Sequence, residues 1–243
     1  MRSKTAMKLI AIFSVCIFSI TVLVGYTSSK RLVPIYRVKT EEKQIALTFD
    51  CAWGADKTLE ILEVLEEYDI DATFFMVSFW AEKYPDMVGA IVESGCEVGN
   101  HSSTHPHFAS MTTAETISEI QSSTEIIESI AGVEINVFRA PFGEYTNDMI
   151  TACDEIGQKV IQWDVDTLDW KGISGSEISQ RITTKVSAGS IILMHNNSDN
   201  VVEGIKDAIP KLIAEGYEFV TVSELIIKED YKINSNGEQI STV

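Results

Sequence analysis

Short apolar segments alternate with amphipathic segments along the chain from Lys43 onward. The apolar segments are rich in β-branched and aromatic residues, which is typical of buried strands, and the amphipathic segments have helical periodicity. We expect strands at residues 44–49, 72–77, 96–99, 135–139, 159–163, 190–194 and 217–222. Strands that alternate with helices predict a parallel α/β sheet, which can close into an irregular barrel or stay open and doubly wound.

Two of the expected helices carry clear start signals. Thr112 with Glu115, and Ser174 with Glu177, each match a capping box, in which a hydroxyl and a carboxylate satisfy the first free amide groups of a helix. We therefore expect helices to begin directly after Thr112 and Ser174.

The N-terminal residues differ from the rest of the 243-residue chain. Residues 9–26 form an uncharged apolar run behind three basic residues, and its length suits a membrane span. No clear cleavage site follows, which favours an uncleaved anchor over a cleaved signal that would release a secreted protein. We predict a cytoplasmic stub and anchor (1–30), a linker (31–42), an extracytoplasmic catalytic domain (43–227) and a loose polar tail (228–243).

Charge narrows the range of partners. The 213 residues after the predicted anchor hold 15 basic and 36 acidic side chains, a net charge of −21. This balance argues against nucleic acid and anionic lipid surfaces as partners, because phosphate binding depends on Lys and Arg. It favours a neutral or cationic substrate, although acidic charge also serves simple solubility.

Polar residues follow several of the expected strands, at the edge where α/β proteins bind ligands. They are Asp50, His101 to His105 (HSSTH), Arg139, Asp169 and His195. The imidazoles of His101 and His105, four residues apart, would lie on one face of a helical turn and could chelate one metal ion. Two imidazoles and one further ligand would leave a position for water, as in catalytic zinc sites.

The motifs TFDC, HSSTH, RAPFG, DTLDW and LMH occur in this order and resemble those of the polysaccharide deacetylase family, the NodB-type carbohydrate esterases of family four. The resemblance covers about residues 44–226. It implies an irregular (β/α)7 barrel that removes N-acetyl groups from amino sugars of a cell-wall polysaccharide, such as peptidoglycan or a chitin-like polymer. Segments such as WDVDTLDWKG, behind an apolar N-terminus, are similar to the sporulation-associated deacetylases of endospore-forming bacteria.

The resemblance also implies roles for individual residues. Asp50 would be the general base, Arg139 would keep it ionised, and His195 would be the general acid, oriented by Asp169. His101 and His105, called the histidine pair below, would bind a divalent metal, Zn²⁺ first of all, with Co²⁺ and Mn²⁺ as alternatives. For the substrate, the backbone N–H of Phe142 would stabilise the oxyanion, while Trp170 and Leu193 would wall the acetyl pocket.

Cys51 departs from the family pattern, which usually has a second aspartate here to complete the metal triad. A thiolate is a good zinc ligand, so Cys51 could replace that carboxylate. Alternatively, Cys51 is a buried thiol and the site keeps only the histidine pair. An O-acetyl esterase and a weakly active or inactive glycan-binding sporulation protein therefore stay open beside the deacetylase.

Overall fold

Parallel strands form the centre of the structure, a computed structural model that describes residues 30–243. The strands are β1 (Arg37–Val38), β2 (Gln44–Cys51), β3 (Thr73–Met76), β4 (Glu97–Asn100), β5 (Val137–Phe138), β6 (Lys159–Val160), β7 (Val165–Asp166), β8 (Ile191–His195), β9 (Glu218–Phe219), β10 (Tyr231–Ile233) and β11 (Glu238–Ser241). The main sheet has the order β6-β5-β4-β3-β2-β8-β7, with β9 beside β2, and its pairs are parallel. The predicted parallel α/β sheet is confirmed.

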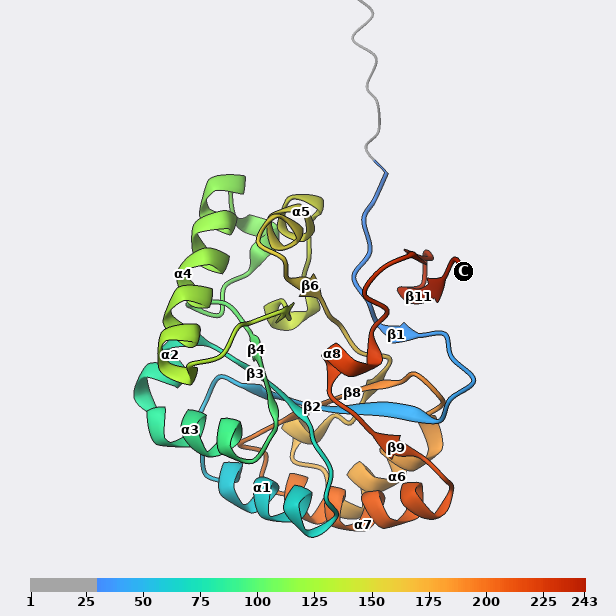
Figure 1. Cartoon of the computed structure of the whole chain (residues 1–243). Helices are drawn as coiled ribbons and strands as arrows, with labels where there is room; N and C mark the ends of the chain where they lie inside the picture. Colours follow the sequence, from blue (N-terminus) through green and yellow to red (C-terminus); the bar gives the residue numbers. More distant parts are fainter. Residues whose placement is uncertain (1–29) are drawn as a thin grey trace, which may run out of the picture. The chain divides into compact units, whose positions relative to one another are not determined.

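Helices cover the outside of these strands, with α1, α3, α4 and α7 around β2, β3 and β4 (Figure 1). The helices are α1 (Thr58–Glu67), α2 (Ser78–Lys83), α3 (Pro85–Glu93), α4 (Thr113–Ala131), α5 (Asn147–Glu155), α6 (Gly175–Lys185), α7 (Val201–Ala214) and α8 (Val222–Leu225). Short 3-10 turns lie at Phe108–Ser110, Pro141–Gly143 and Asp169–Lys171. The capping boxes at Thr112 and Ser174 are both present, so the predicted starts of α4 and α6 are confirmed.

The main sheet forms a half-barrel of parallel strands, in which the end strands β6 and β7 do not pair with each other. Residues 31–38, called the N-terminal strap below, cross this gap. The amide of Ile35 donates to the carbonyl of Val160 at 2.9 Å, and its own carbonyl accepts from the amide of Gln162 at 2.7 Å. The segment expected to be a linker is thus hydrogen-bonded to the domain.

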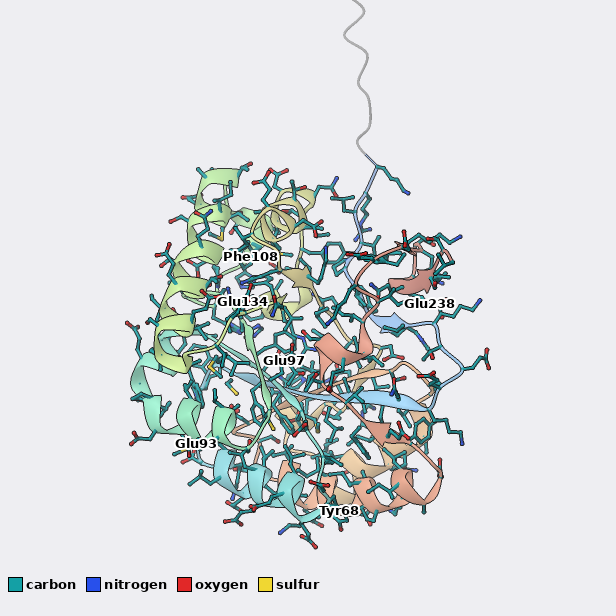
Figure 2. The ribbon with its side chains drawn as sticks, viewed as in Figure 1. Tyr68, Glu93, Glu97, Phe108, Glu134 and Glu238 are labelled. Carbon is teal, nitrogen blue, oxygen red and sulfur yellow. The ribbon has the colours of Figure 1, made fainter. Side chains whose placement is uncertain are left out.

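The C-terminal residues are ordered, and the prediction of a loose tail after residue 227 is wrong. Strands β10 and β11 pair antiparallel, and β11 pairs in parallel with β1 of the strap (Figure 1). Glu238, labelled in Figure 2, also lies 3.7 Å from the guanidinium Nε of Arg37. A polar segment is held here because its backbone completes a small sheet.

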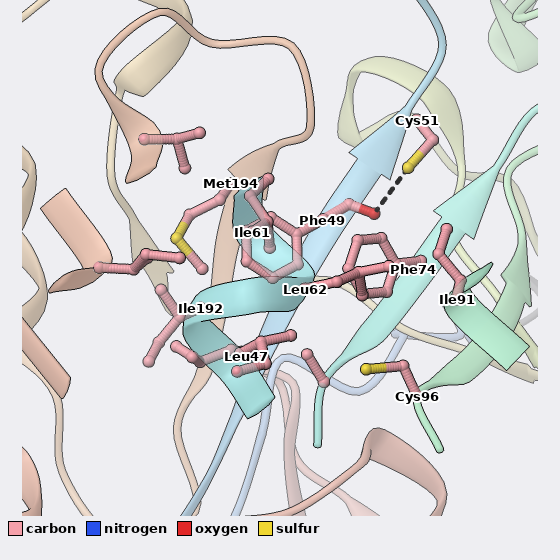
Figure 3. Packing of buried hydrophobic residues seen from close by; sticks show 14 of the residues in the cluster. Leu47, Phe49, Cys51, Ile61, Leu62, Phe74, Ile91, Cys96, Ile192 and Met194 are labelled. Carbon is pink, nitrogen blue, oxygen red and sulfur yellow. Dashed lines mark hydrogen bonds between the residues drawn. The ribbon is translucent and has the colours of Figure 1, made fainter. Parts of the chain in front are cut away.

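Side chains of β2 alternate between two faces. One set packs in the main core and comprises Ile45, Leu47, Phe49 and Cys51. Leu47, Phe49 and Cys51 are seen beside Ile61 and Leu62 of α1 in Figure 3. The other set, Ala46, Thr48 and Asp50, lies on the opposite face of the strand, where Ala46 joins a second buried cluster. The end of β2 therefore directs Asp50 and Cys51 to opposite sides of the sheet.

The predicted membrane anchor lies outside the described residues. Among residues 30–243, no helix has the length and apolar character needed to cross a bilayer.

Candidate active site

A buried ion pair joins Asp50 at the end of β2 to Arg139 after β5. The Arg139 guanidinium Nη1 donates to Asp50 Oδ1 at 2.8 Å and to Thr48 Oγ1 at 2.8 Å, while Nη2 donates to the Gln162 carbonyl at 3.2 Å. Burial opposes ionisation of Asp50, but the charge and hydrogen bond of Arg139 outweigh it and hold the carboxyl pKa below its usual value. Asp50 is therefore a carboxylate at neutral pH.

The histidine pair lies beside this carboxylate, in the loop after β4. The Nε2 atom of His101 is 3.6 Å from Asp50 Oδ2, and the ring centroids of His101 and His105 are 5.1 Å apart. The loop is not a helical turn, because Ser102 and His105 have φ angles of 80° and 57°. The expected helical geometry is wrong, although the expected proximity of the two rings is present.

Both rings of the histidine pair are neutral. Burial lowers the pKa of His101, and burial together with the neighbouring His101 lowers the pKa of His105 to about 4. The Nδ1 atom of His101 lies 2.8 Å from the carbonyl of Arg139, which orients the ring and leaves Nε2 toward Asp50. Neutral, oriented imidazoles are the form that binds metal ions.

His195 faces Asp50 from the neighbouring strand. Their Cα atoms are register partners of β2 and β8, so both side chains project from the same face of the sheet. Asp169 holds His195 twice, through its backbone N–H at 2.8 Å and its ring Nδ1 at 2.9 Å. Burial lowers the pKa of His195, but the hydrogen bond and charge of Asp169 outweigh burial and raise it. The two sides of the site thus hold a carboxylate and a histidine whose protonated form is favoured.

Cys51 does not reach this site, and the hypothesis that it is a metal ligand is contradicted by the geometry. Its side chain is fully buried in the main core, and Sγ contacts the carbonyl of Phe49 at 3.8 Å (Figure 3). Burial, and then the charge of Asp50, raise the pKa of this thiol well above its usual value. Strand alternation is the cause, because consecutive residues of β2 point to opposite faces.

The donor set suits a divalent cation only in part. Among the described residues, no three His, Cys, Asp or Glu side chains are grouped closely enough to hold an ion. The histidine pair supplies two imidazole donors, and Asp50 is the carboxylate beside them. The pair fits zinc or a similar ion, while the third ligand is missing from its expected position at Cys51.

An aromatic cleft of about 710 Å³ opens above these groups. Its lining includes the three residues expected at the substrate, Phe142, Trp170 and Leu193. Leu193 is 4% exposed, whereas Phe142 and Trp170 are 57% and 59% exposed. Phe142 has a φ angle of 59°, and its ring packs edge-on against His105 at 4.7 Å.

The cleft also contains residues to which the sequence motifs assigned no role in the reaction. Trp53 is 60% exposed and packs edge-on against His105 at 5.7 Å, and Trp163 and Asp199 are further lining residues. Trp163 is the last residue of the strand expected at 159–163 and the first of the segment WDVDTLDWKG, so its position at the end of that strand was the available signal. Asp199 lies in the turn before α7, and nothing in its sequence context marks it.

Comparisons with known proteins agree with this architecture. A family profile described as polysaccharide deacetylase matches residues 37–161. A peptidoglycan-N-acetylglucosamine deacetylase of Bacillus cereus is 34% identical over 186 residues, which cover 75% of this chain and 68% of that protein. The peptidoglycan-N-acetylmuramic acid deacetylase PdaC of Bacillus subtilis is 33% identical over 77% of this chain, but only 40% of PdaC is covered.

Solved structures include a related protein described as a pseudoenzyme. A CE4 family pseudoenzyme from Bacillus anthracis superposes with a TM-score of 0.78 at 32% identity, covering 81% of this chain and 69% of that one. A mutant of it, described as having restored enzymatic activity, has the same TM-score at 33% identity.

The half-barrel carries a carboxylate, a histidine pair and a third histidine held by a carboxylate at the carboxyl ends of its strands, which is the arrangement of a hydrolase site on an α/β fold. The chain belongs to the polysaccharide deacetylase family, CE4.

Proposed function

We propose that this protein hydrolyses N-acetyl groups of amino sugars in a cell-wall glycan, with peptidoglycan as the first substrate to test. The observation that carries the proposal is the register pairing of Asp50 with His195, beside the histidine pair and under one cleft. The lowered pKa of Asp50 and the raised pKa of His195 favour the ionised base and the protonated acid that amide hydrolysis needs. The related deacetylases named for N-acetylglucosamine and N-acetylmuramic acid support this substrate class.

Each residue has a defined task in the proposed reaction. Asp50 takes a proton from the water that attacks the acetamide carbonyl, and Arg139 keeps Asp50 ionised before the reaction. The backbone N–H of Phe142 donates to the developing oxyanion. His195, with Nδ1 held by Asp169, gives a proton to the nitrogen as the C–N bond breaks. Acetate and a free amine result, while Trp170 and Leu193 enclose the methyl group.

The histidine pair would hold a divalent cation, Zn²⁺ or alternatively Co²⁺ or Mn²⁺. Such an ion supplies Lewis acidity, which polarises a carbonyl and makes water easier to ionise. Only two firm protein ligands are present, so we expect weaker affinity than in a site with three.

The test is acetate release from acetylated chito-oligosaccharides and muropeptides by purified protein with added zinc or cobalt. We expect acetate and free amines from the wild type, and a loss of at least about a hundredfold in Asp50→Asn and His101→Ala. Acetate without free amines would identify an O-acetyl esterase instead. Unchanged rates of acetate release in both variants would refute the assignment of Asp50 and His101 to the active site.

A second candidate is a glycan-binding protein with little or no activity. The observation that favours it is the position of Cys51, which faces the core and leaves the metal site without its third expected ligand. Folded wild-type protein that binds glycan but releases no acetate under any metal would support this candidate.

We also propose a location outside the cytoplasm, at the membrane or secreted. The support is the apolar run at residues 9–26 behind basic residues, together with the cell-wall substrates named for the relatives. A role in sporulation stays a prediction from the resemblance alone. Fractionation of cells that express the full chain, probed with an antibody to the domain, tests the location.

A further inference from the structure

The loop that carries the histidine pair does not satisfy its amide groups through helical backbone hydrogen bonds. A His-x-x-x-His segment in a helix would have its amide groups satisfied by carbonyls four residues earlier. Here Ser102 and His105 have positive φ angles, so the segment between them has no helical hydrogen bonds. Its amide groups therefore need other acceptors.

Side chains supply all of these acceptors. The amide of Ser102 donates to Asn100 Oδ1 at 2.8 Å, and the amide of His105 donates to Ser102 Oγ at 3.0 Å. Between them, Glu119 Oε1 accepts from the amides of Ser103 and Thr104 and from the Thr104 hydroxyl. One carboxylate oxygen on α4 thus receives three hydrogen bonds from the middle of the loop.

The two histidines depend on this support to different degrees. His101 is fixed by other contacts, since its amide donates to the Met76 carbonyl at 2.9 Å and its ring faces the Arg139 carbonyl. His105 has no hydrogen bond from its ring to another residue among the described contacts, and its ring packs against those of Trp53, His101 and Phe142. The position of His105 therefore depends on these ring contacts and on the loop backbone, which Ser102 Oγ holds at His105 and Glu119 holds at the two preceding residues.

We propose that Glu119 is a positioning residue that keeps His105 next to His101 so that the pair can hold one metal ion. The inference rests on the proposed function only in taking the histidine pair as a metal site. Residues that orient metal ligands typically change metal affinity by about 10-fold to 100-fold when they are removed. A charged acceptor also forms stronger bonds than a neutral one, and three bonds converge on it here.

The test compares Glu119→Ala and Glu119→Gln with Glu125→Ala, an exposed glutamate on the same helix that serves as the matched control. Hydrogen exchange of the Ser103 and Thr104 amides is measured on metal-free protein, and zinc affinity is measured by titration with the metal alone. We expect exchange at these amides to rise about tenfold or more in Glu119→Ala, and zinc affinity to fall about tenfold. Glu119→Gln, which keeps an acceptor oxygen, should retain part of the protection of these amides and part of the zinc affinity. Glu125→Ala should match the wild type in both measurements.

Two results would overturn the proposal. One is a folded Glu119→Ala protein with wild-type exchange and wild-type zinc affinity. The other is a wild-type protein that binds zinc no better than His101→Ala, which would show that the histidine pair does not bind the metal. Neither readout uses a glycan, so a failure of deacetylase activity is distinguishable from a failure of the positioning role.

Discussion

Asp169 controls the protonation of His195 through a hydrogen bond and a charge. His195 must be protonated to act as an acid, and its raised pKa extends the protonated form to higher pH. In Asp169→Asn this pKa falls, so the alkaline limb of the kcat/KM profile should move to lower pH by about one unit. A profile of rate against pH measures this shift. Asp199→Asn, which removes another carboxylate of the cleft, is the control and should leave the limb in place.

The same pKa shift has a consequence for stability. Because the folded pKa of His195 is raised, its protonation stabilises the fold at pH values below the unfolded pKa of histidine. This contribution is lost as pH rises through the folded pKa.

In the pH–rate experiment, an alkaline limb of the kcat/KM profile that does not move in Asp169→Asn would contradict the role of Asp169.

Cys51 gives a second prediction at the scale of one side chain. Its thiol lies in the apolar core, on the face of β2 opposite Asp50, so it does not reach the histidine pair. Cys51→Ala should therefore leave the zinc dissociation constant unchanged and cost about 1 kcal/mol of stability. Titration with zinc and urea unfolding measure the two effects. A larger zinc dissociation constant in this variant would show that the Cys51 thiol is a ligand of the metal.

Sequence motifs identified most of the side chains that meet at the site, because strand ends of a parallel sheet converge on one edge. They did not reveal where Cys51 points. The apolar pattern ended the first strand at residue 49, whereas β2 continues to Cys51 and so alternates Asp50 and Cys51 across the sheet. The histidine loop was also mistaken for a helical turn, since residue spacing carries no information on φ angles.

At the scale of elements, the sequence predicted correctly the helix starts that are determined by side chains of the same segment. Thr112 and Ser174 begin helices because their side chains satisfy free amide groups within the same segment. Strands β10 and β11 escaped prediction because their sequence is polar, and Glu238 and its neighbours are held by pairing with β1. Pairing of segments about 200 residues apart is tertiary structure, which no local pattern encodes.

At the scale of the whole domain, the N-terminal strap crosses the gap of the half-barrel and is linked to the active site by hydrogen bonds. Its Ile35 carbonyl accepts from the amide of Gln162, and the carbonyl of Gln162 accepts from Arg139, the partner of Asp50. On the other side of the gap, the amide of Val38 donates to the carbonyl of Gly189 at 2.9 Å. The strap thus supports Gln162, which holds the arginine of the catalytic ion pair, and is itself held at Gly189 before the start of β8.

Gly189 provides a way to separate the contribution of the strap from backbone strain. It has a φ angle of 80°, and a Cβ atom there would overlap the carbonyl oxygen of Val38. Gly216 has a similar φ of 84°, but no atom lies within 4 Å of its Cβ position. Gly216→Ala should therefore cost only the strain of a left-handed residue, about 1 kcal/mol. Gly189→Ala should cost about 1 to 3 kcal/mol more, because the strap must shift.

Urea unfolding of the two variants measures the difference in free energy, and acetate release measures its effect on the site. We expect the strap to loosen in Gly189→Ala, which removes support from Gln162 and lowers activity at temperatures where the protein is still folded. Gly216→Ala should keep its activity, because its position has no contact with the strap. Equal losses of stability and activity in the two variants would mean that the strap does not support the site.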